Sequence, residues 1–314
     1  MHPLLTKYLS KLFIQQWVIG IGRCLPGDVL AQKKFDPVIK WMKVDSADRF
    51  IADPFLLKDD EGNYRILFED YTFSTGYGHI AELDVNNDLS LDKARKILDT
   101  GSHLSYPFIF HEKGHTYVFP ESAQSGKLTC YEYHPSSGRL EPVKVLLDQP
   151  VLDSTIIKKD GRYWLFCTLL GPGEDRQLNI FFSDQLLGQY QSHPMNPVKD
   201  NLTGSRPAGN LVEFEGNWFR PAQDSRYTYG GGLVINKITR LDEQAFAEEL
   251  YMRVSPGVNS GSREGIRGMH TLNFTGDMVV TDGTRWRFAP VIKCRQLWMK
   301  ISKKNKKKEQ EHAL

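Results

Sequence analysis

The sequence predicts an all-β chain folded as a five-bladed β-propeller, with blades of about four antiparallel strands. First, a motif that opens an apolar strand recurs at a spacing of roughly 50 residues, with a longer last interval, which is the size of one four-stranded blade. Second, a tight turn follows each copy and leads into an aromatic strand. The five copies are Ala52-Asp53-Pro54-Phe55-Leu56, Ser105-Tyr106-Pro107-Phe108-Ile109, Leu152-Asp153-Ser154-Thr155-Ile156, Ser205-Arg206-Pro207-Ala208-Gly209 and Met269-His270-Thr271-Leu272-Asn273.

The turn after each copy contains a glycine, which supplies the positive φ that tight hairpins need. The strands that follow are aromatic and β-branched, as buried strands should be. Five hairpins of one design indicate a repeat. The turn glycines are Gly62, Gly114, Gly161, Gly216 and Gly276.

The elements can be assigned in chain order. Residues 1–13 are expected to form a short amphipathic helix, and residues 17–21 a strand that pairs with the last blade and so closes the ring. Residues 28–45 connect to the first repeat. We therefore expect an N-terminal extension over residues 1–14, one propeller over residues 15–296 and a basic disordered tail over residues 297–314.

Outer strands follow the aromatic ones in the first four repeats. They show alternating or continuous apolar patterns over residues 78–83, 128–133, 178–182 and 232–236. Residues 242–250, in the long fourth interval, are predicted to form a short helix.

The composition fits a globular protein with a sizeable core. The chain has 314 residues, of which 40% are hydrophobic, and a formal net charge of +2. Residues 300–314 alone carry +4, so the remainder is near −2, which argues against a nucleic-acid-binding body. The tail is expected to be a solvated end, and the alternative is contact with an anionic membrane surface or RNA. Its lysines are Lys300, Lys303, Lys304, Lys306, Lys307 and Lys308.

The four cysteines are widely scattered and form no CxxC pair, so neither a zinc site nor a disulfide framework is indicated. A reducing compartment fits best, and residues 4–21 are a poor signal peptide because Lys7 and Lys11 interrupt them. We therefore expect a cytoplasmic protein.

The inner strand of every blade lines the axis of a propeller, so the first residues of the repeats should converge on one pocket. These are Asp53, Tyr106, Asp153, Arg206 and His270. The ends of the second strands should form a second ring. That ring would hold Glu69, Asp70, Glu121, Thr168, Gln223, Asp224 and Asp282. Carboxylates gathered in this way are costly unless something binds there.

Each of these residues also has a structural interpretation. Asp53 before Pro54 suits a turn, and Asp153 can bond its own backbone. Glu121 suits a solvated loop position, Arg206 a neutralising role and His270 a satisfied core position. The shared register of the five repeats favours a common site over these separate explanations.

Paired carboxylates suit glycosidic bond chemistry, in which a protonated acid assists the leaving oxygen and a carboxylate activates water or attacks the anomeric carbon. Two acids in one pocket of low dielectric constant would push their pKa values apart, as this division of roles needs.

At these residues the sequence resembles the five-bladed propellers of glycoside hydrolase family 43 and the invertase-like superfamily. The resemblance implies a general-base Asp at the start of blade one, matched by Asp53, and an orienting Asp at the start of blade three, matched by Asp153. The hydrolases usually carry a general-acid Glu in blade four, where this chain has Arg206 instead. Glu121 or Asp224 would have to supply the proton instead, and Glu121 is the expected donor.

A closer resemblance, over about residues 15–290, is to the N-terminal propeller of plant glucosamine inositolphosphorylceramide transferases and its bacterial relatives. The passages that carry it are Ala52-Asp53-Pro54-Phe55, Gly78-His79-Ile80-Ala81, Leu104-Ser105-Tyr106-Pro107-Phe108, Pro120-Glu121-Ser122, Ser205-Arg206-Pro207-Ala208-Gly209, Arg220-Pro221-Ala222-Gln223-Asp224 and His270-Thr271-Leu272-Asn273. In the plant proteins a separate C-terminal domain resembles the glycosyltransferase, so the resemblance does not imply transferase activity for this chain.

Together these features predict a carbohydrate-active propeller that binds a sugar or sugar phosphate in its axial funnel and cleaves or transfers a glycosidic bond with a non-standard acid. The alternative is a non-catalytic glycan-binding or scaffolding module in surface-polysaccharide or glycolipid biosynthesis, with a glycosyltransferase as partner. We expect no cofactor and no metal; a metal-assisted site of His270 with carboxylates is a weaker third alternative, because a lone histidine is a poor metal signature. The catalytic candidates are Asp53, Asp153 and Glu121, and the substrate-binding candidates are Tyr106, Arg206, Asp224, His270, Glu69 and Asp70.

Overall fold

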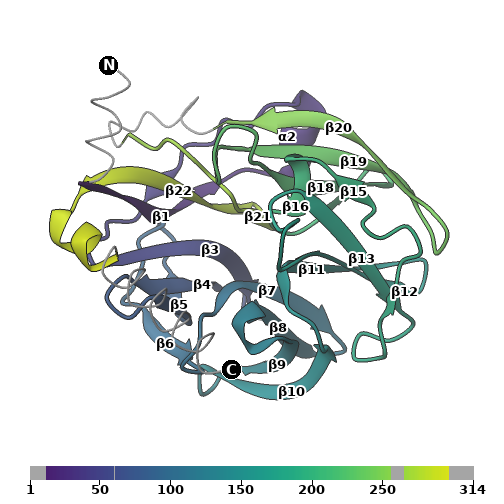
Figure 1. Cartoon of the computed structure of the whole chain (residues 1–314), viewed down its shortest axis with the longest axis horizontal. Helices are drawn as coiled ribbons and strands as arrows, with labels where there is room; N and C mark the ends of the chain where they lie inside the picture. Colours follow the sequence, from purple (N-terminus) through teal and green to yellow (C-terminus); the bar gives the residue numbers. More distant parts are fainter. Residues whose placement is uncertain (1–11, 60, 256–264, 297–314) are drawn as a thin grey trace, which may run out of the picture.

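Five antiparallel sheets surround a central axis as the blades of a propeller (Figure 1). This computed structural model describes residues 12–59, 61–255 and 265–296. The predicted all-β fold with five blades is confirmed. The proposed helix over residues 1–13 and the basic tail fall almost entirely outside the described residues.

The first three blades follow the order of the chain. Blade one contains β3 (Arg49–Lys58), β4 (Tyr64–Thr72), β5 (Tyr77–Val85) and β6 (Arg95–Leu98). Blade two contains β7 (Ser105–Glu112), β8 (His115–Glu121), β9 (Leu128–His134) and β10 (Arg139–Leu147), with the 3-10 turn η1 (Ala123–Ser125) between β8 and β9. Blade three contains β11 (Val151–Lys159), β12 (Arg162–Leu169), β13 (Gln177–Ser183), β14 (Gln191–Ser192) and β15 (Lys199–Asp200).

Blade four continues the pattern and blade five uses both ends of the chain. Blade four contains β16 (Thr203–Pro207), β17 (Val212–Phe214), β18 (Asn217–Asp224), β19 (Leu233–Leu241) and β20 (Phe246–Val254). Blade five contains β21 (Leu272–Thr275), β22 (Met278–Phe288), β1 (Phe13–Arg23) and β2 (Lys40–Trp41), and α2 (Pro26–Gln32) lies between β1 and β2 in sequence.

The predicted turns are true two-residue hairpins in four blades. In blade five, Gly276-Asp277 joins β21 to β22 with positive φ at Gly276 alone, whereas the other three turns have positive φ at both central residues. Lys113-Gly114 joins β7 to β8 with φ values of 53° and 81°, and Asp160-Gly161 joins β11 to β12 with 53° and 77°. Glu215-Gly216, which joins β17 to β18, likewise has positive φ at both residues. Positive φ at both central residues matches the right-handed twist of the flanking strands, which explains why glycine occupies the second position.

The inner strands of blades one, two and three share a β-bulge. Asp53, Tyr106 and Asp153 adopt φ values of 51°, 43° and 50°, at the points where the register with the second strand shifts. A bulge bends the strand and re-aims its side chain, and a residue other than glycine is uncommon in this left-handed region. The motif found in the sequence therefore marks a local backbone feature that is repeated around the axis.

The ring is closed by the N-terminal strand, as predicted. β1 pairs with β22 from Phe13↔Phe288 to Arg23↔Met278. The strand is longer than the predicted residues 17–21 because its pairing continues at both ends. β2 pairs in turn with the outer side of β1 at Gly20↔Trp41. Both β22 and β1 therefore have a neighbouring strand on each side, and neither is an unpaired edge strand.

The predicted helix over residues 242–250 is wrong, because residues 246–254 form the strand β20. Ala247, Glu248 and Glu249 favour helices, but β20 pairs with β19 over its whole length. Phe246, Met252 and Val254 are buried. Tertiary pairing has overridden local propensity. The predicted outer strands coincide with β5, β9, β13 and β19.

Among the described residues, no helix is both long and apolar enough to cross a membrane.

Candidate functional site

The bulges bring acidic side chains together at the axis. In blades one to three, the residue before each bulge pairs with the end of the second strand, as Ala52↔Glu69, Ser105↔Glu121 and Leu152↔Thr168. This common register places the candidate acids at one level of the propeller. We call the group the axial cluster; its members are Asp53, Glu69, Glu121, Asp153, Arg206, His270 and Asp282.

Asp282, on β22, organises one side of the axial cluster. Its carboxylate accepts backbone N–H groups from His270 at 2.8 Å, Thr271 at 3.1 Å and Asp53 at 3.2 Å. Oδ2 of Asp282 also lies 2.5 Å from Nδ1 of His270, as an ion pair. Thr271 donates its hydroxyl to Asp53 at 2.6 Å.

The histidine is held as a cation. Burial opposes its protonation, but the carboxylates of Asp282 and Asp53 outweigh burial and raise the pKa of His270 to about 9. Nε2 of His270 is 3.6 Å from Oδ1 of Asp53. Burial raises the pKa of Asp53 to about 6, and the charge of His270 limits that rise.

The ligand atoms of Asp53, His270 and Asp282 lie within 4.8 Å of one another, which is a spacing that could hold a metal ion. Metal ligation requires a neutral histidine, whereas these neighbours favour the protonated form. Asp282 also already accepts three backbone N–H groups. The donor set therefore fits an internal ion pair better than a metal centre.

Among the described residues, no lysine or arginine forms an ion pair with Glu121 or Glu69, and Arg206, which lies near Glu121, is paired with Asp153. Burial and the charge of Asp153 raise the pKa of Glu121 to about 8, although Arg206 opposes the rise. Burial raises the pKa of Glu69 well above its usual value, and Asp53 and Glu121 add to it. The nearest cation candidate for Glu69 is His103, whose Nε2 lies 3.8 Å away.

Asp153 is the acid that is neutralised. Arg206 donates from Nε to Oδ2 of Asp153 at 2.5 Å, and Gln223 donates to the same oxygen at 3.0 Å. The backbone N–H of Asp153 donates to Glu121 at 3.2 Å. The guanidinium of Arg206 also lies over the ring of Tyr229, 5.4 Å from its centroid.

Three predicted ligand contacts lie apart from this network. Tyr106 is fully buried, and its hydroxyl contacts Thr155 at 2.9 Å and accepts the N–H of Gly209 at 2.6 Å, so it joins the inner strands. Asp70 is held by Arg49 through two bonds of 2.5 and 2.7 Å.

The third, Asp224, is bound by two arginines at the end of β18. Arg226 donates to both of its oxygens at 2.8 Å, and Arg253 donates at 2.9 Å. Burial would raise the pKa of Asp224, but Arg226 lowers it. Asp224 is therefore paired structurally within blade four.

The sequence interpretation missed two aromatic residues of the site. Trp17, on the closing strand, stacks on His270 with ring centroids 4.1 Å apart. Tyr229 meets His270 edge-on at 5.5 Å. Gly230 permits this approach, because a Cβ atom there would lie 2.4 Å from the Trp17 ring. The Tyr-Gly-Gly-Gly run after β18 was the available signal.

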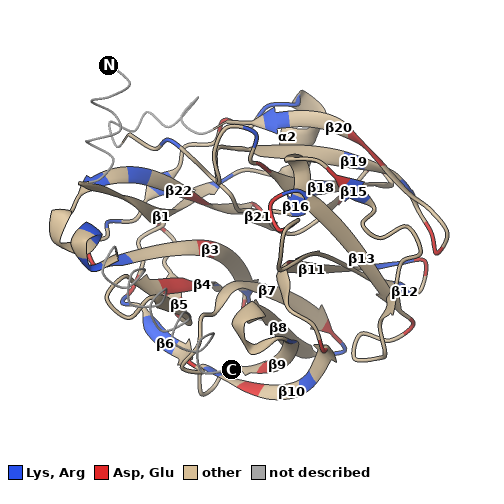
Figure 2. Cartoon of the chain, viewed as in Figure 1, with Lys and Arg blue, Asp and Glu red and all other residues tan. Residues whose placement is uncertain are grey.

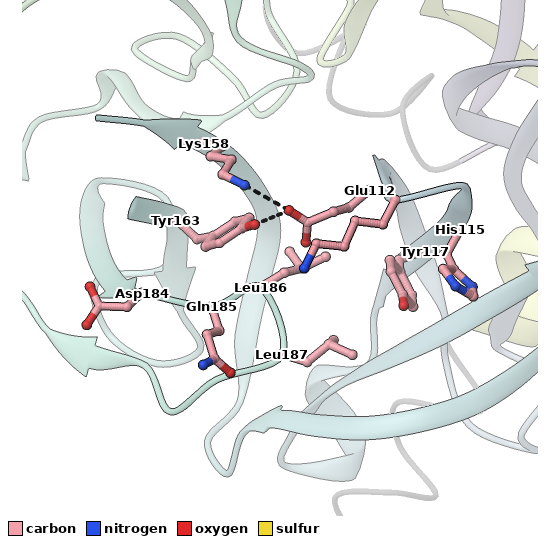
Figure 3. A pocket seen from close by; sticks show the side chains of 10 residues that line it. Glu112, His115, Tyr117, Lys158, Tyr163, Asp184, Gln185, Leu186 and Leu187 are labelled. Atoms are coloured by element: carbon pink, nitrogen blue, oxygen red, sulfur yellow. Dashed lines mark hydrogen bonds and ion pairs between the residues drawn. The ribbon is translucent and has the colours of Figure 1, made fainter. Parts of the chain in front are cut away.

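Away from the axial cluster, a hollow of about 540 Å³ lies between blades two and three at the far ends of β7 and β11 (Figure 3). Lys158 Nζ lies 3.0 Å from Glu112, and Tyr163 donates its hydroxyl to the same carboxylate. Burial opposes ionisation of Glu112, but these two donors lower its pKa. Glu112, one of the two carboxylates that line this hollow, is thus already compensated, unlike Glu121 and Glu69.

A protein-family model described as the N-terminal part of glucosamine inositolphosphorylceramide transferase 1 matches residues 35–275. The chain is 34% identical over 237 residues to the curated glucosamine inositolphosphorylceramide transferase 1 of Oryza sativa subsp. japonica, and 33% identical over 207 residues to that of Arabidopsis thaliana. The matches cover 71% and 63% of this chain but 30% and 27% of those relatives. The chain thus spans less than a third of their length.

Solved structures share the fold at low sequence identity. A family 117 glycoside hydrolase from the marine bacterium Zobellia galactanivorans aligns with a TM-score of 0.54 and 13% identity, over 89% of this chain and 92% of that one. A thermostable family 43 glycoside hydrolase aligns with a TM-score of 0.50 and 16% identity, over 67% and 78%. These structural alignments establish a common propeller fold. At such low sequence identity they give no information about the chemistry, which has to be argued from the residues of the axial cluster.

Proposed function

Because the chain belongs to the family of the N-terminal part of glucosamine inositolphosphorylceramide transferase 1, we propose that it is a carbohydrate-active propeller that binds a sugar or sugar phosphate at the axial cluster. A carbohydrate-related or glycolipid-related module is what the family and the fold support. The specific ligand and its site are our proposal.

One observation carries this proposal. Asp53, Glu69 and Glu121 are buried acids whose pKa values are raised, and their repeated register directs them to one place. A buried carboxylate whose charge is only partly compensated destabilises a fold, so such groups gather mainly where a ligand uses them. Carboxylates that accept hydrogen bonds and acids that donate them suit the hydroxyl groups of a sugar.

The acids also differ in the way that glycosidic chemistry needs. With a pKa of about 8, Glu121 is largely protonated at neutral pH and suits the proton donor. Asp53, with a pKa of about 6, is largely ionised there and suits the base or nucleophile. Asp153 would orient the substrate through Arg206, whose remaining N–H groups suit a phosphate or another anionic group.

A second function, non-catalytic binding within a glycan or glycolipid assembly system, is favoured by a different observation. Arg206 stands where related hydrolases carry an acid, and it neutralises Asp153 at 2.5 Å. A module of this kind would present its ligand to a partner glycosyltransferase. The two functions share one binding site and differ in turnover.

Calorimetric titration with glucosamine, glucosamine 1-phosphate and myo-inositol 1-phosphate tests the binding site, because the name of the curated relatives combines these groups. We expect Arg206→Met to weaken binding of the phosphate probes by about tenfold or more and that of glucosamine by less. Arg226→Met is the matched control, since Arg226 lies in the same blade and pairs with Asp224. Equal losses from both variants, or no binding of any probe, would overturn the proposal.

Turnover of a panel of nitrophenyl glycosides separates the two functions. The enzymatic function predicts hydrolysis that Asp53→Asn and Glu121→Gln each reduce by at least about 100-fold. Binding without turnover selects the non-catalytic function, and turnover that both variants retain refutes catalysis by Asp53 and Glu121.

A further inference from the structure

The far end of blade five carries an exposed apolar surface, which we call the tip patch and define as Leu12, Phe13, Trp286, Phe288 and Val291. Leu12, Trp286, Phe288 and Val291 are 41%, 44%, 59% and 66% exposed. Phe13 packs edge-on against Phe288, with ring centroids 5.5 Å apart. Large apolar side chains gathered at one place on a surface mark an interaction site.

The tip patch is built on paired strands. The pairs Phe13↔Phe288 and Gln15↔Trp286 end the ladder between β1 and β22. Between the two aromatic residues, Arg287 turns to the other face and donates to the carbonyl oxygen of Val44 at 2.7 Å. Behind the patch, Ile14 is buried together with Ala289 and Ile292. The exposed rings therefore belong to an ordered ribbon.

Positive charge surrounds these rings. Arg267, whose backbone N–H donates to Thr284 at 2.8 Å, and Arg295 are exposed beside the end of β22. Figure 2 shows Lys and Arg segments on the helical turn that follows β22. In sequence, Lys7 and Lys11 directly precede the patch, and residues 300–314 after it carry +4.

We propose that the tip patch docks the propeller on an anionic lipid surface. Tryptophan and phenylalanine partition into the interface between headgroups and acyl chains, while lysines and arginines near the surface attract anionic headgroups. Both chain segments that lead away from the patch carry lysines, so the charge complements such a surface. A second copy of this chain would bring the same positive charges together, which disfavours self-association there.

Docking would also orient the axial cluster. β22 runs from Asp282 in the cluster to Phe288 in the patch, six residues further on, or about 20 Å. The same end of blade one contributes Tyr71 and Phe73, which pack with Ile14 behind the patch and directly follow Glu69 and Asp70. The cluster and the patch therefore lie toward the same end of the blades. A sugar carried by a lipid headgroup could then reach the site, an extension that rests on the proposed function.

Co-sedimentation of the full chain with vesicles tests this proposal. We expect binding to phosphatidylcholine vesicles that contain about 30% phosphatidylserine to exceed binding to pure phosphatidylcholine by roughly 100-fold or more. Trp286→Ser with Phe288→Ser should weaken it by about tenfold or more. Replacing Lys300, Lys303, Lys304, Lys306, Lys307 and Lys308 by Gln should remove most of the preference for the anionic lipid. The matched control is Leu250→Ser, because Leu250 is 49% exposed on β20.

The outcomes separate this proposal from the proposed function. Vesicle binding that the double Ser variant retains, or equal binding to anionic and neutral vesicles, would overturn the docking proposal. So would a chain that does not bind vesicles but dimerises with increasing concentration, if the double Ser variant abolishes that dimerisation. Arg206→Met should leave vesicle binding unchanged while it weakens the phosphate probes. Vesicle binding without any sugar binding would support docking and refute the ligand site alone.

Discussion

The buried ion pair of blade four and the axial cluster are balanced in opposite ways. In blade four, Arg220 is fully buried and donates to both oxygens of Glu248, at 2.9 and 2.7 Å. Lys199 lies 2.7 Å from the same carboxylate. Burial opposes the charge of Glu248, but Arg220 and Lys199 outweigh it and lower its pKa.

The axial cluster has more acids than cations. Burial dominates at Glu121 and Glu69, so their pKa values rise where that of Glu248 falls. The comparison shows that this chain can neutralise a buried carboxylate completely when only stability is at stake. The uncompensated acids at the axis are therefore not a requirement of the fold, which is why we assign them to ligand binding.

The largest effect is expected in the balanced group. Arg220→Leu should lower the free energy of unfolding by about 3 to 5 kcal/mol, because it leaves Glu248 buried without its main partner. Chemical denaturation at pH 7 measures this change. A second variant, Arg220→Met combined with Glu248→Leu, should recover most of the loss. A loss below about 1 kcal/mol for the single variant would contradict the contrast between the two groups.

Matched substitutions of glutamate by glutamine should act in opposite directions. In the folded state the pKa of Glu121 is raised to about 8, so its contribution to stability is lost as the pH rises from about 4.5 through 8. Glu121→Gln should therefore stabilise the protein by about 2 to 4 kcal/mol at pH 8 and by almost nothing at pH 4. Glu248→Gln should destabilise it at pH 8, because the lowered pKa of Glu248 gives stability that is lost only as the pH falls.

Thermal denaturation of both variants between pH 4 and pH 9 checks this prediction. His270 affects the pH dependence of stability in the same direction as Glu121. Its pKa is raised in the folded state, so the stability that it contributes is lost as the pH rises from 6.5 through about 9. Wild-type stability should fall over this range, and the fall should be shallower in Glu121→Gln. Parallel pH profiles for wild type and Glu121→Gln would refute the raised pKa.

The smallest effect is expected for a charged pair in solvent. Arg23 and Asp277 form an ion pair at 2.5 Å with about half of each side chain exposed. A double-mutant cycle with Arg23→Ala and Asp277→Ala should give a coupling energy of about 0.2 to 1 kcal/mol, and less at high salt. A coupling energy as large as the loss of stability in Arg220→Leu would mean that burial does not explain the difference between this exposed pair and the buried pair of Arg220 and Glu248.

The sequence allowed the fold to be predicted because its turns and strand starts repeat at fixed offsets, as at Lys113-Gly114 and Asp160-Gly161. It also identified the axial acids, since Asp53 and Asp153 occupy the same position of the repeat. The strand β20 was missed because its helix-forming residues pair with β19, which no local pattern reveals. The aromatic neighbours of His270 were missed for a similar reason: Trp17 reaches it through ring closure, and Tyr229 through a loop.

Ring closure has a consequence for how the protein is made. Gln16 is synthesised early, yet its partner Arg285 follows 269 residues later. At roughly 5 to 20 residues per second, the ribosome needs on the order of 15 to 50 s to reach that partner. During this interval the nascent β1 can pair only with the two-residue strand β2 and lacks β22, the partner along its whole length, and Trp17 cannot yet cover His270. We therefore expect chaperone demand early in translation, and we expect ligand binding to appear only after the chain has been completed.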